Sequence, residues 1–113
     1  MRPKNLSPQA LRDIDRAVDD IAATVAGPAF ADRFAVAVAD AAERVARHPL
    51  RGHRRLELLP GRFRFWPMKG FDYLLVYNAE HPDRPVLRVV YMARDLARLL
   101  ADLAALPDPD QPD

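Results

Sequence analysis

Arginine and lysine side chains alternate with aromatic side chains along the second half of the chain, and such a mixture could bind phosphate groups. Cations stabilise the negative charge that develops on a phosphate during RNA cleavage, and aromatic rings stack on unpaired bases. We nevertheless expect most of these rings in the hydrophobic core, because two faces must be filled. A metal-independent ribonuclease could draw on one set of residues: Arg62, Arg64, Lys69, Arg88 and Tyr91.

Other kinds of reactive site have little support in the sequence. The chain has no cysteine, and its three histidines fall in expected loops without the spacing of a metal pair. Ser7 and Thr24 are the only hydroxyl side chains besides tyrosine, and no G-x-S-x-G, P-loop or G-x-G-x-x-G motif occurs. The carboxylates between residues 13 and 20 are expected on a solvated helix face. The sequence therefore predicts neither a metal nor a cofactor.

A basic block occupies the middle of the chain. Between Arg44 and Lys69 there are eight basic residues and one acid, a net charge of +7, so the remainder carries −6 of the total of +1. Such a block can meet phosphates or an acidic partner protein, or it can be a solvated arginine-rich face. The overall balance argues against a protein that coats DNA.

The length of 113 residues suits one compact domain, which we expect over 1–106. Residues 107–113 are acidic and rich in proline, and we expect them to be disordered. No apolar run is long enough for a membrane span, and no signal-like stretch follows the N-terminus. We therefore expect a cytoplasmic protein with no membrane contact.

Helical spacing dominates the first half of the chain. Ser7-Pro8 is typical of a helix start, and apolar residues recur from Leu11 to Val25 at steps of three and four until Gly27. A second helix is expected from Pro28 to His48-Pro49, and the short link predicts an antiparallel helical hairpin.

After Pro49 the period of the pattern changes to two. Strands are expected over 62–66, 71–79 and 86–92, with a short extended piece at 56–59 and a last helix from Asp95. Short connections predict an antiparallel meander, so the fold class is α+β, with the hairpin packed on one face of the sheet. The other face is expected to be partly open and basic.

Three stretches resemble the RelE/ParE superfamily of bacterial toxins, and the local motifs point to its ParE branch. They are residues 6–10 (LSPQA), residues 60–68 (PGRFRFWPM) running into 73–77 (YLLVY), and residues 87–96 (LRVVYMARDL). The last is similar to the family's R-V-x-x-x-x-R-D-[LI] pattern, and the second contains its G-x-x-R-x-x-P element. The resemblance implies a RelE/ParE-like fold with a short N-terminal edge strand around Pro3 to Leu6.

The resemblance also implies the toxin of a plasmid-stabilisation type toxin–antitoxin system, neutralised by a ParD-like antitoxin that alone binds operator DNA. ParE-like toxins inhibit DNA gyrase, whereas RelE-like toxins cleave mRNA on the ribosome. No tyrosine or histidine follows Tyr91, which could itself point into the core, so we favour gyrase inhibition without enzymatic activity. The alternatives are a ribosome-dependent nuclease and a non-toxic protein that only regulates its operon.

Two contact surfaces follow as expectations. The target is expected to meet the basic sheet face and the corner after the last strand, namely Arg62, Arg64, Lys69, Arg88, Arg94 and Asp95. Asp95 could instead only cap the last helix. The antitoxin is expected to lay a helix or strand across the hairpin and the sheet edge, meeting Arg44, Arg47, Arg51, Arg54, Arg55 and Trp66.

Overall fold

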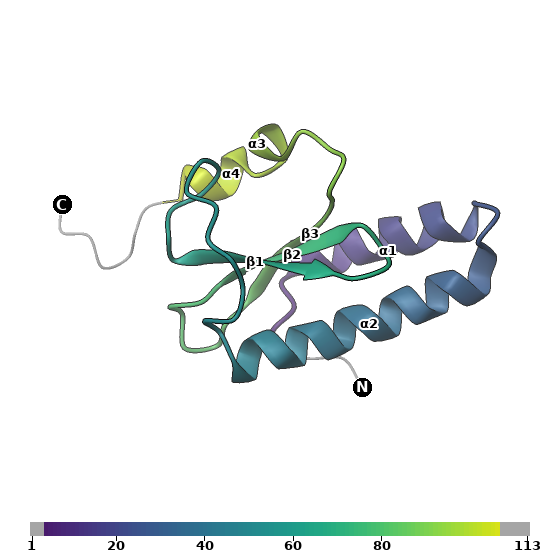
Figure 1. Cartoon of the computed structure of the whole chain (residues 1–113), viewed down its shortest axis with the longest axis horizontal. Helices are drawn as coiled ribbons and strands as arrows, with labels where there is room; N and C mark the ends of the chain where they lie inside the picture. The colour runs from purple at the N-terminus through teal and green to yellow at the C-terminus, as the bar shows by residue number, and fades with distance from the viewer. Residues whose placement is uncertain (1–3, 107–113) are drawn as a thin grey trace, which may run out of the picture.

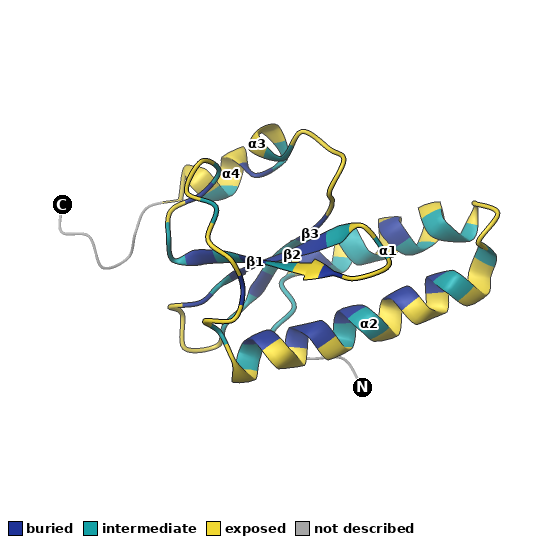
Figure 2. Ribbon diagram, viewed as in Figure 1, coloured by how far each residue is buried: buried dark blue, intermediate teal, exposed yellow. Residues whose placement is uncertain are grey.

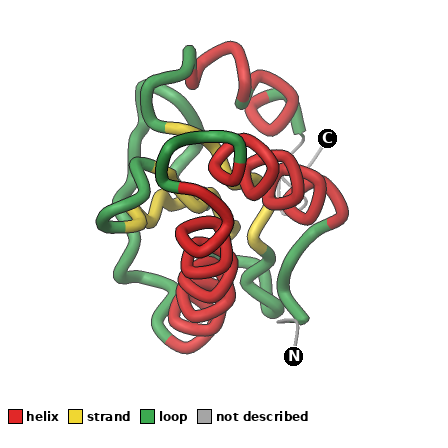
Figure 3. Tube along the Cα trace, turned by 90° about the vertical axis from the view of Figure 1, so that its right-hand side faces the viewer, coloured by secondary structure: helices red, strands yellow, loops and turns green. Residues whose placement is uncertain are grey.

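The computed structural model describes residues 4–106, which form an α+β fold. Two helices come first, α1 (Pro8–Ala22) and α2 (Gly27–Arg47). Three strands follow, β1 (Phe63–Met68), β2 (Tyr73–Asn78) and β3 (Val86–Tyr91), and then two single-turn helices, α3 (Leu96–Leu99) and α4 (Ala101–Ala104). The sheet lies between the α1–α2 hairpin and the C-terminal helices (Figures 1 and 3). The expected disordered tail lies outside the described residues.

The hairpin forms much as the sequence predicts. Ser7 caps α1, because its Oγ accepts a hydrogen bond of 3.0 Å from the Ala10 N–H. The helix nevertheless ends at Ala22, and Val25, expected in its apolar stripe, is fully exposed. The chain turns before Gly27, which has a φ of +73° and begins α2. Only glycine adopts this left-handed conformation without strain, so its position fixes where the second helix can start.

The three strands form an antiparallel sheet in the order β1-β2-β3, as expected for a meander. Val76 pairs with Arg88 and Tyr77 with Val86, so Leu87 is an extra residue in β3. The expected N-terminal strand is reduced to one parallel bridge between Leu6 and Val86. Pro3 lies outside the described residues.

Both faces of the sheet are buried, and the expected open basic face is wrong. The hairpin covers one face over a core that includes Phe34, Val38, Leu75 and Tyr77. On the other face the 55–61 loop and the C-terminal helices close a second core. Figure 2 shows buried residues on the strands between these two layers. The second core consists of Leu59, Phe63, Phe65, Leu74, Val76, Val90 and Leu100.

Hydrogen bonds from other segments occupy both edges of the sheet. At the β1 edge the Phe65 N–H and carbonyl pair with His53, the Phe63 N–H donates to the Pro60 carbonyl, and Pro67 has no N–H. At the β3 edge Val86 pairs with Asn5 and Ser7. Free strand edges invite pairing with other chains, so this arrangement limits such pairing.

No helix within residues 4–106 is both long enough and apolar enough to cross a membrane.

Candidate functional site

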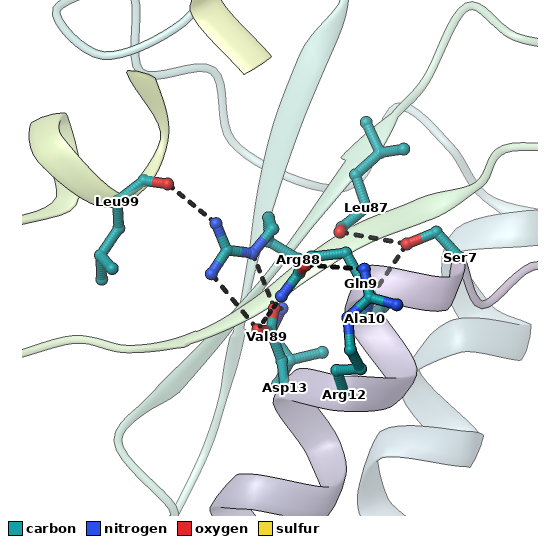
Figure 4. Close-up of polar contacts among 9 residues, drawn as sticks. All are labelled: Ser7, Gln9, Ala10, Arg12, Asp13, Leu87, Arg88, Val89 and Leu99. Atoms are coloured by element: carbon teal, nitrogen blue, oxygen red, sulfur yellow. Dashed lines mark hydrogen bonds and ion pairs between the residues drawn. The ribbon is translucent and has the colours of Figure 1, made fainter. Parts of the chain in front are cut away.

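Arg88, on β3, is held in a network that joins three elements (Figure 4). Its Nε donates to Asp13 Oδ2 at 2.8 Å and its Nη2 to Asp13 Oδ1 at 3.2 Å, while Nη1 donates to the Leu99 carbonyl at 2.8 Å. Asp13 Oδ2 also accepts a bond of 2.9 Å from the Val89 N–H. The Arg88 and Asp13 side chains are only 17% and 10% exposed. Arg88 therefore fastens β3 to α1 and α3, and little of its guanidinium is free to meet a ligand.

The sequence reasoning placed Asp13 on a solvated helix face, and this is wrong. Its carboxylate turns toward β3 because it satisfies both the Arg88 guanidinium and an N–H at the strand edge. A half-buried charge needs such partners. Nothing local in the sequence distinguished Asp13 from Asp15, Asp19 and Asp20, which are all exposed in the structure.

A groove of about 390 Å³ opens beside this network, between α1 and β3. Arg12 and Arg16 line it from α1, and Arg94 lines it from the segment after β3. Tyr73 and Tyr91 line it from the sheet, with ring centroids 5.3 Å apart in an edge-to-face arrangement. Tyr91 is 41% exposed, so the expectation that it points into the core is wrong.

Charges gather around Tyr73 in this groove. Burial raises the pKa of Tyr73, and the Asp20 carboxylate and Tyr91 add to the rise, whereas Arg94 acts in the opposite direction. Asp20 and Arg94 line the same groove as Tyr73.

The corner after β3 has a structural part and an exposed part. Asp95 caps α3, because its Oδ1 accepts a hydrogen bond of 3.2 Å from the Arg98 N–H. This hydrogen bond agrees with the alternative that the sequence left open for Asp95, a helix cap. Arg94 is exposed, and its side chain forms no hydrogen bond or ion pair with the rest of residues 4–106. Of the two, Arg94 is the residue free to contact a partner.

Arg62 and Arg64 lie at the other end of the sheet. Arg64 Nη1 donates to the Gly52 carbonyl at 2.9 Å and to the Leu50 carbonyl at 3.2 Å, so it anchors the loop after α2. The Arg62 guanidinium lies 4.6 Å from the centre of the Phe63 ring and donates to the Leu106 carbonyl. Both line a pocket of about 310 Å³ together with Arg54.

The residues of the alternative nuclease set do not converge. Arg62 and Lys69 flank opposite ends of β1, and Arg64 is bound to the loop. Arg88 and Tyr91 share the α1–β3 groove, but Arg88 is already bonded to Asp13. Metal-independent cleavage needs its acid, base and cations around one phosphate. Among residues 4–106, moreover, no three histidine, aspartate or glutamate side chains lie close enough to hold a metal ion.

The residues expected to meet the antitoxin spread over the end of α2 and the following loop. Arg44, Arg51 and Arg54 are exposed, and Arg47 makes a loose pair of 3.9 Å with Glu43. Arg55 pairs with Glu57 at 3.0 Å. Trp66 is half-buried and shares a shallow pocket with Arg44 and Lys69. The expected target and antitoxin sets therefore intermingle, because Lys69 and Arg54 each line a pocket with members of the other set.

A second groove, of about 690 Å³, runs along the outer side of the hairpin. Leu11, Ile14 and Val18 line it from α1, and Val36, which is 63% exposed, lines it from α2. The only charged residues in its lining are Asp15 and Asp19. The apolar stripe of α1 thus contributes to an outer groove as well as to the core. The sequence analysis recognised the stripe but expected no groove along it.

A comparison with known protein families matches most of the chain. The sequence model of the family described as "ParE toxin of type II toxin-antitoxin system, parDE" matches residues 5–96, which include both helices of the hairpin and all three strands. The chain belongs to this ParE toxin family. No curated protein and no solved structure shows significant similarity to it. Two helices on a three-stranded antiparallel sheet, with short C-terminal helices, agree with the expected RelE/ParE-like fold.

The family assignment confirms a toxin of a type II toxin–antitoxin system, for which an antitoxin partner is implied. The R-V-x-x-x-x-R-D-L stretch now has a structural reading. Its first arginine, Arg88, is bonded to Asp13, its second, Arg94, projects into the α1–β3 groove, and its aspartate, Asp95, caps α3. The sequence reasoning missed Arg12 and Arg16, although their spacing of four residues places them on one face of a helix.

Proposed function

We propose that this ParE-family toxin inhibits DNA gyrase by binding it and is neutralised by a ParD-like antitoxin. The observation that carries the proposal is the dispersal of the candidate nuclease residues over three separate sites. Arg62 and Arg64 line one pocket, Lys69 lines another, and Arg88 and Tyr91 line the α1–β3 groove, where Arg88 is already paired with Asp13. A binding surface tolerates such dispersal, whereas a catalytic site does not.

The target surface is the α1–β3 groove with Arg94 at its end. Arg94 combines exposure with the lack of an internal partner among the described residues, so its charge is available for recognition. The expected contact by Asp95 is left out of this surface because capping explains that residue. Gyrase works on DNA inside the cell, which places the proposed activity in the cytoplasm.

The antitoxin surface is the outer groove of the hairpin, continued by the basic residues at the end of α2. A helix can bury apolar side chains against Leu11, Ile14 and Val36, whereas a strand would find the β1 and β3 edges occupied. The antitoxin would then bind a different side of α1 from the target, and operator DNA would be bound by the antitoxin.

The test is a supercoiling reaction with purified gyrase and the purified chain, scored for lost supercoiling and for trapped cleaved DNA. A parallel reaction with translating ribosomes scores mRNA cleavage. Inhibited gyrase with intact mRNA is the expected result. Cleaved mRNA with unaffected gyrase would instead support the ribosome-dependent nuclease, and no effect in either reaction would support a non-toxic regulator.

The variant Arg94→Gln sharpens this test. We expect it to inhibit gyrase at least about tenfold less well, the loss that removal of one well-placed interface arginine causes. Arg33→Gln is the matched control, because Arg33 is an exposed arginine over Phe30 on α2, outside both grooves. Thermal melting of both variants separates a lost contact from a lost fold.

A further inference from the structure

The α1–β3 groove carries more positive charge than the acids in its lining neutralise. Its lining contains four arginines and two aspartates, and one pair of these, Arg88 and Asp13, is internal. Arg16 and Arg94 form no side-chain hydrogen bond within the described residues, and Arg12 bonds only to the neutral Gln9. Asp20 remains as the one acid against these three guanidinium groups, so the groove favours an anionic ligand.

The spacing of the charges suits a chain of phosphates. Arg12 and Arg16 lie one helical turn apart, about 6 Å along the axis. Two guanidinium groups in such a row can face successive phosphates of one strand, while Arg94 approaches from the opposite wall of the groove. Guanidinium binds phosphate oxygens through paired hydrogen bonds.

The aromatic side chains add the second element of recognition. Tyr91 is exposed at the groove, and its contact with Tyr73 holds the ring in one orientation. A fixed, exposed ring beside arginines is a surface on which an unpaired base can stack. A double helix keeps its bases stacked on one another, so this feature favours a single strand.

A peptide strand is a poorer occupant. It would need the free backbone groups of the β3 edge, but the Val89 N–H is bonded to Asp13 and the Val86 N–H to the Asn5 carbonyl. An acidic peptide could still meet the arginines without pairing, so the experiment includes one.

We infer that the α1–β3 groove binds a short segment of single-stranded DNA, with Arg12, Arg16 and Arg94 on its phosphates and Tyr91 stacked on a base. The inference rests on the proposed function, since gyrase acts on DNA. The toxin would then contact the target's DNA as well as its protein.

The experiment is a titration of a fluorescein-labelled thymidine decamer with the full chain, followed by fluorescence anisotropy at several salt concentrations. We expect Tyr91→Ala to weaken binding by about tenfold or more, which is the loss found when a stacking ring is removed, and Tyr91→Phe to bind like the unchanged protein. Arg16→Gln combined with Arg94→Gln should reduce the slope of log affinity against log salt by about 1.4, because each phosphate contact on a single strand contributes about 0.7.

Two controls decide whether the groove is responsible. Arg33→Gln removes an exposed arginine elsewhere and should leave both affinity and slope unchanged, and melting curves should show that all variants fold. A decamer of glutamate should compete poorly. The inference is overturned if the thymidine decamer does not bind, if Arg33→Gln weakens binding as much as the groove variants, or if the glutamate peptide competes equally well.

The same titration is repeated with a ribonucleotide decamer in place of the thymidine decamer. Binding of both decamers supports the inference, because neither the rings nor the guanidinium groups require a 2′-hydroxyl, whereas binding of the ribonucleotide alone overturns it. The titration contains no gyrase, so its failure leaves gyrase inhibition to be judged by the supercoiling reaction. Conversely, failure of the chain to inhibit gyrase would leave the measurement of DNA binding to be judged by the titration alone.

Discussion

One buried tyrosine positions the loop that carries much of the basic block. The Gly52 N–H donates to Tyr77 Oη at 2.9 Å, and Tyr77 Oη donates to the Pro49 carbonyl at 2.6 Å. Arg64 bonds the Gly52 carbonyl from the neighbouring strand. The loop between α2 and β1 therefore takes its course from side chains of the sheet, although it has no regular structure of its own.

We predict that Gly52→Ala lowers the free energy of unfolding by about 1 to 3 kcal/mol, the range for an added methyl group in a packed site. A Cβ at this position would lie 2.8 Å from Tyr77 Cε1 and would also meet the hydroxyl group. Gly61→Ala is the control, because its Cβ would meet nothing closer than the side-chain atom Arg54 Cδ, at 3.4 Å. Urea denaturation of both variants measures the difference, and equal stability would contradict the packing described for Gly52.

The ionisation of Tyr77 makes stability depend on alkaline pH. Burial raises the pKa of Tyr77 above its ordinary value near 10, while the Gly52 N–H and Arg64 lower it less strongly. The folded state therefore holds this proton more tightly than the unfolded state, so its stabilising contribution is complete below pH 10 and is lost as the pH rises further.

We predict that the free energy of unfolding in urea falls above pH 10. In the Tyr77→Phe variant this fall should be smaller over the same pH range. The variant should also be less stable at neutral pH by about 1 to 3 kcal/mol, because the buried Gly52 N–H and Pro49 carbonyl lose their partner. Tyr73, whose pKa is also raised, leaves some dependence in the variant. A pH dependence identical in both proteins would refute the role of Tyr77.

At the scale of elements, the Asp13–Arg88 pair is the chief polar link between the hairpin and the sheet. It joins residues 75 positions apart and also reaches the Leu99 carbonyl on α3. A half-buried pair is costly to break on one side, because the other charge is left without a partner.

We predict that Asp13→Leu destabilises the fold by about 3 kcal/mol or more, since it leaves both the Arg88 guanidinium and the Val89 N–H unpaired. The double variant Asp13→Leu with Arg88→Met should lose less stability than the sum of the losses in the two single variants. Asp15→Leu is the control on the same helix, at an exposed position. Additive losses in the double-mutant cycle would show that the two side chains do not interact.

The C-terminal helices should be stabilising parts of the fold. Leu100 is 1% exposed and lies with Phe63, Phe65 and Val76 in the second core. We predict that Leu100→Ala costs about 2 to 5 kcal/mol, the usual range for a leucine in a core, whereas Leu106→Ala, at a half-exposed site, is nearly neutral. A neutral Leu100→Ala would indicate that this face of the sheet is open after all.

The elements were largely predictable from the sequence, and the layers were not. The periodicity of apolar residues and the helix-capping residues predicted the hairpin and the three strands, because these signals are local. The apolar residues on both faces of β2, Leu74 and Val76 against Leu75 and Tyr77, already implied two cores. What covers the second face depends on Leu59 and Leu100, which are separated in the chain. The partner of Asp13, 75 residues away, had no local signal at all.

Across the whole molecule, α1 separates two surfaces. Arg12, Arg16 and Asp20 line the groove toward β3, whereas Leu11, Ile14 and Val18 line the outer groove toward α2. One helix thus presents a cationic side and an apolar side in different directions. From the proposed surfaces we expect that binding of the target and binding of the antitoxin can be altered separately.

We predict that Val36→Asp abolishes neutralisation by the antitoxin while the variant still inhibits gyrase. Val36 is 63% exposed, so the change should leave thermal stability nearly unchanged, yet it places a charge in the apolar groove next to Asp15 and Asp19. Arg94→Gln should show the reverse pattern, with the antitoxin bound normally. Pull-down with the antitoxin and the supercoiling reaction measure the two properties, and loss of both in either variant would contradict separate surfaces.

The occupied edges of the sheet bear on how the toxin behaves when no partner is bound to it. A released chain with an exposed strand edge would pair with other copies and leave solution as aggregates. Here His53 and Pro67 protect β1, and Asn5 and Asp13 protect β3. We therefore expect the unbound toxin to remain monomeric, so that self-association does not reduce the amount that is free to bind a partner.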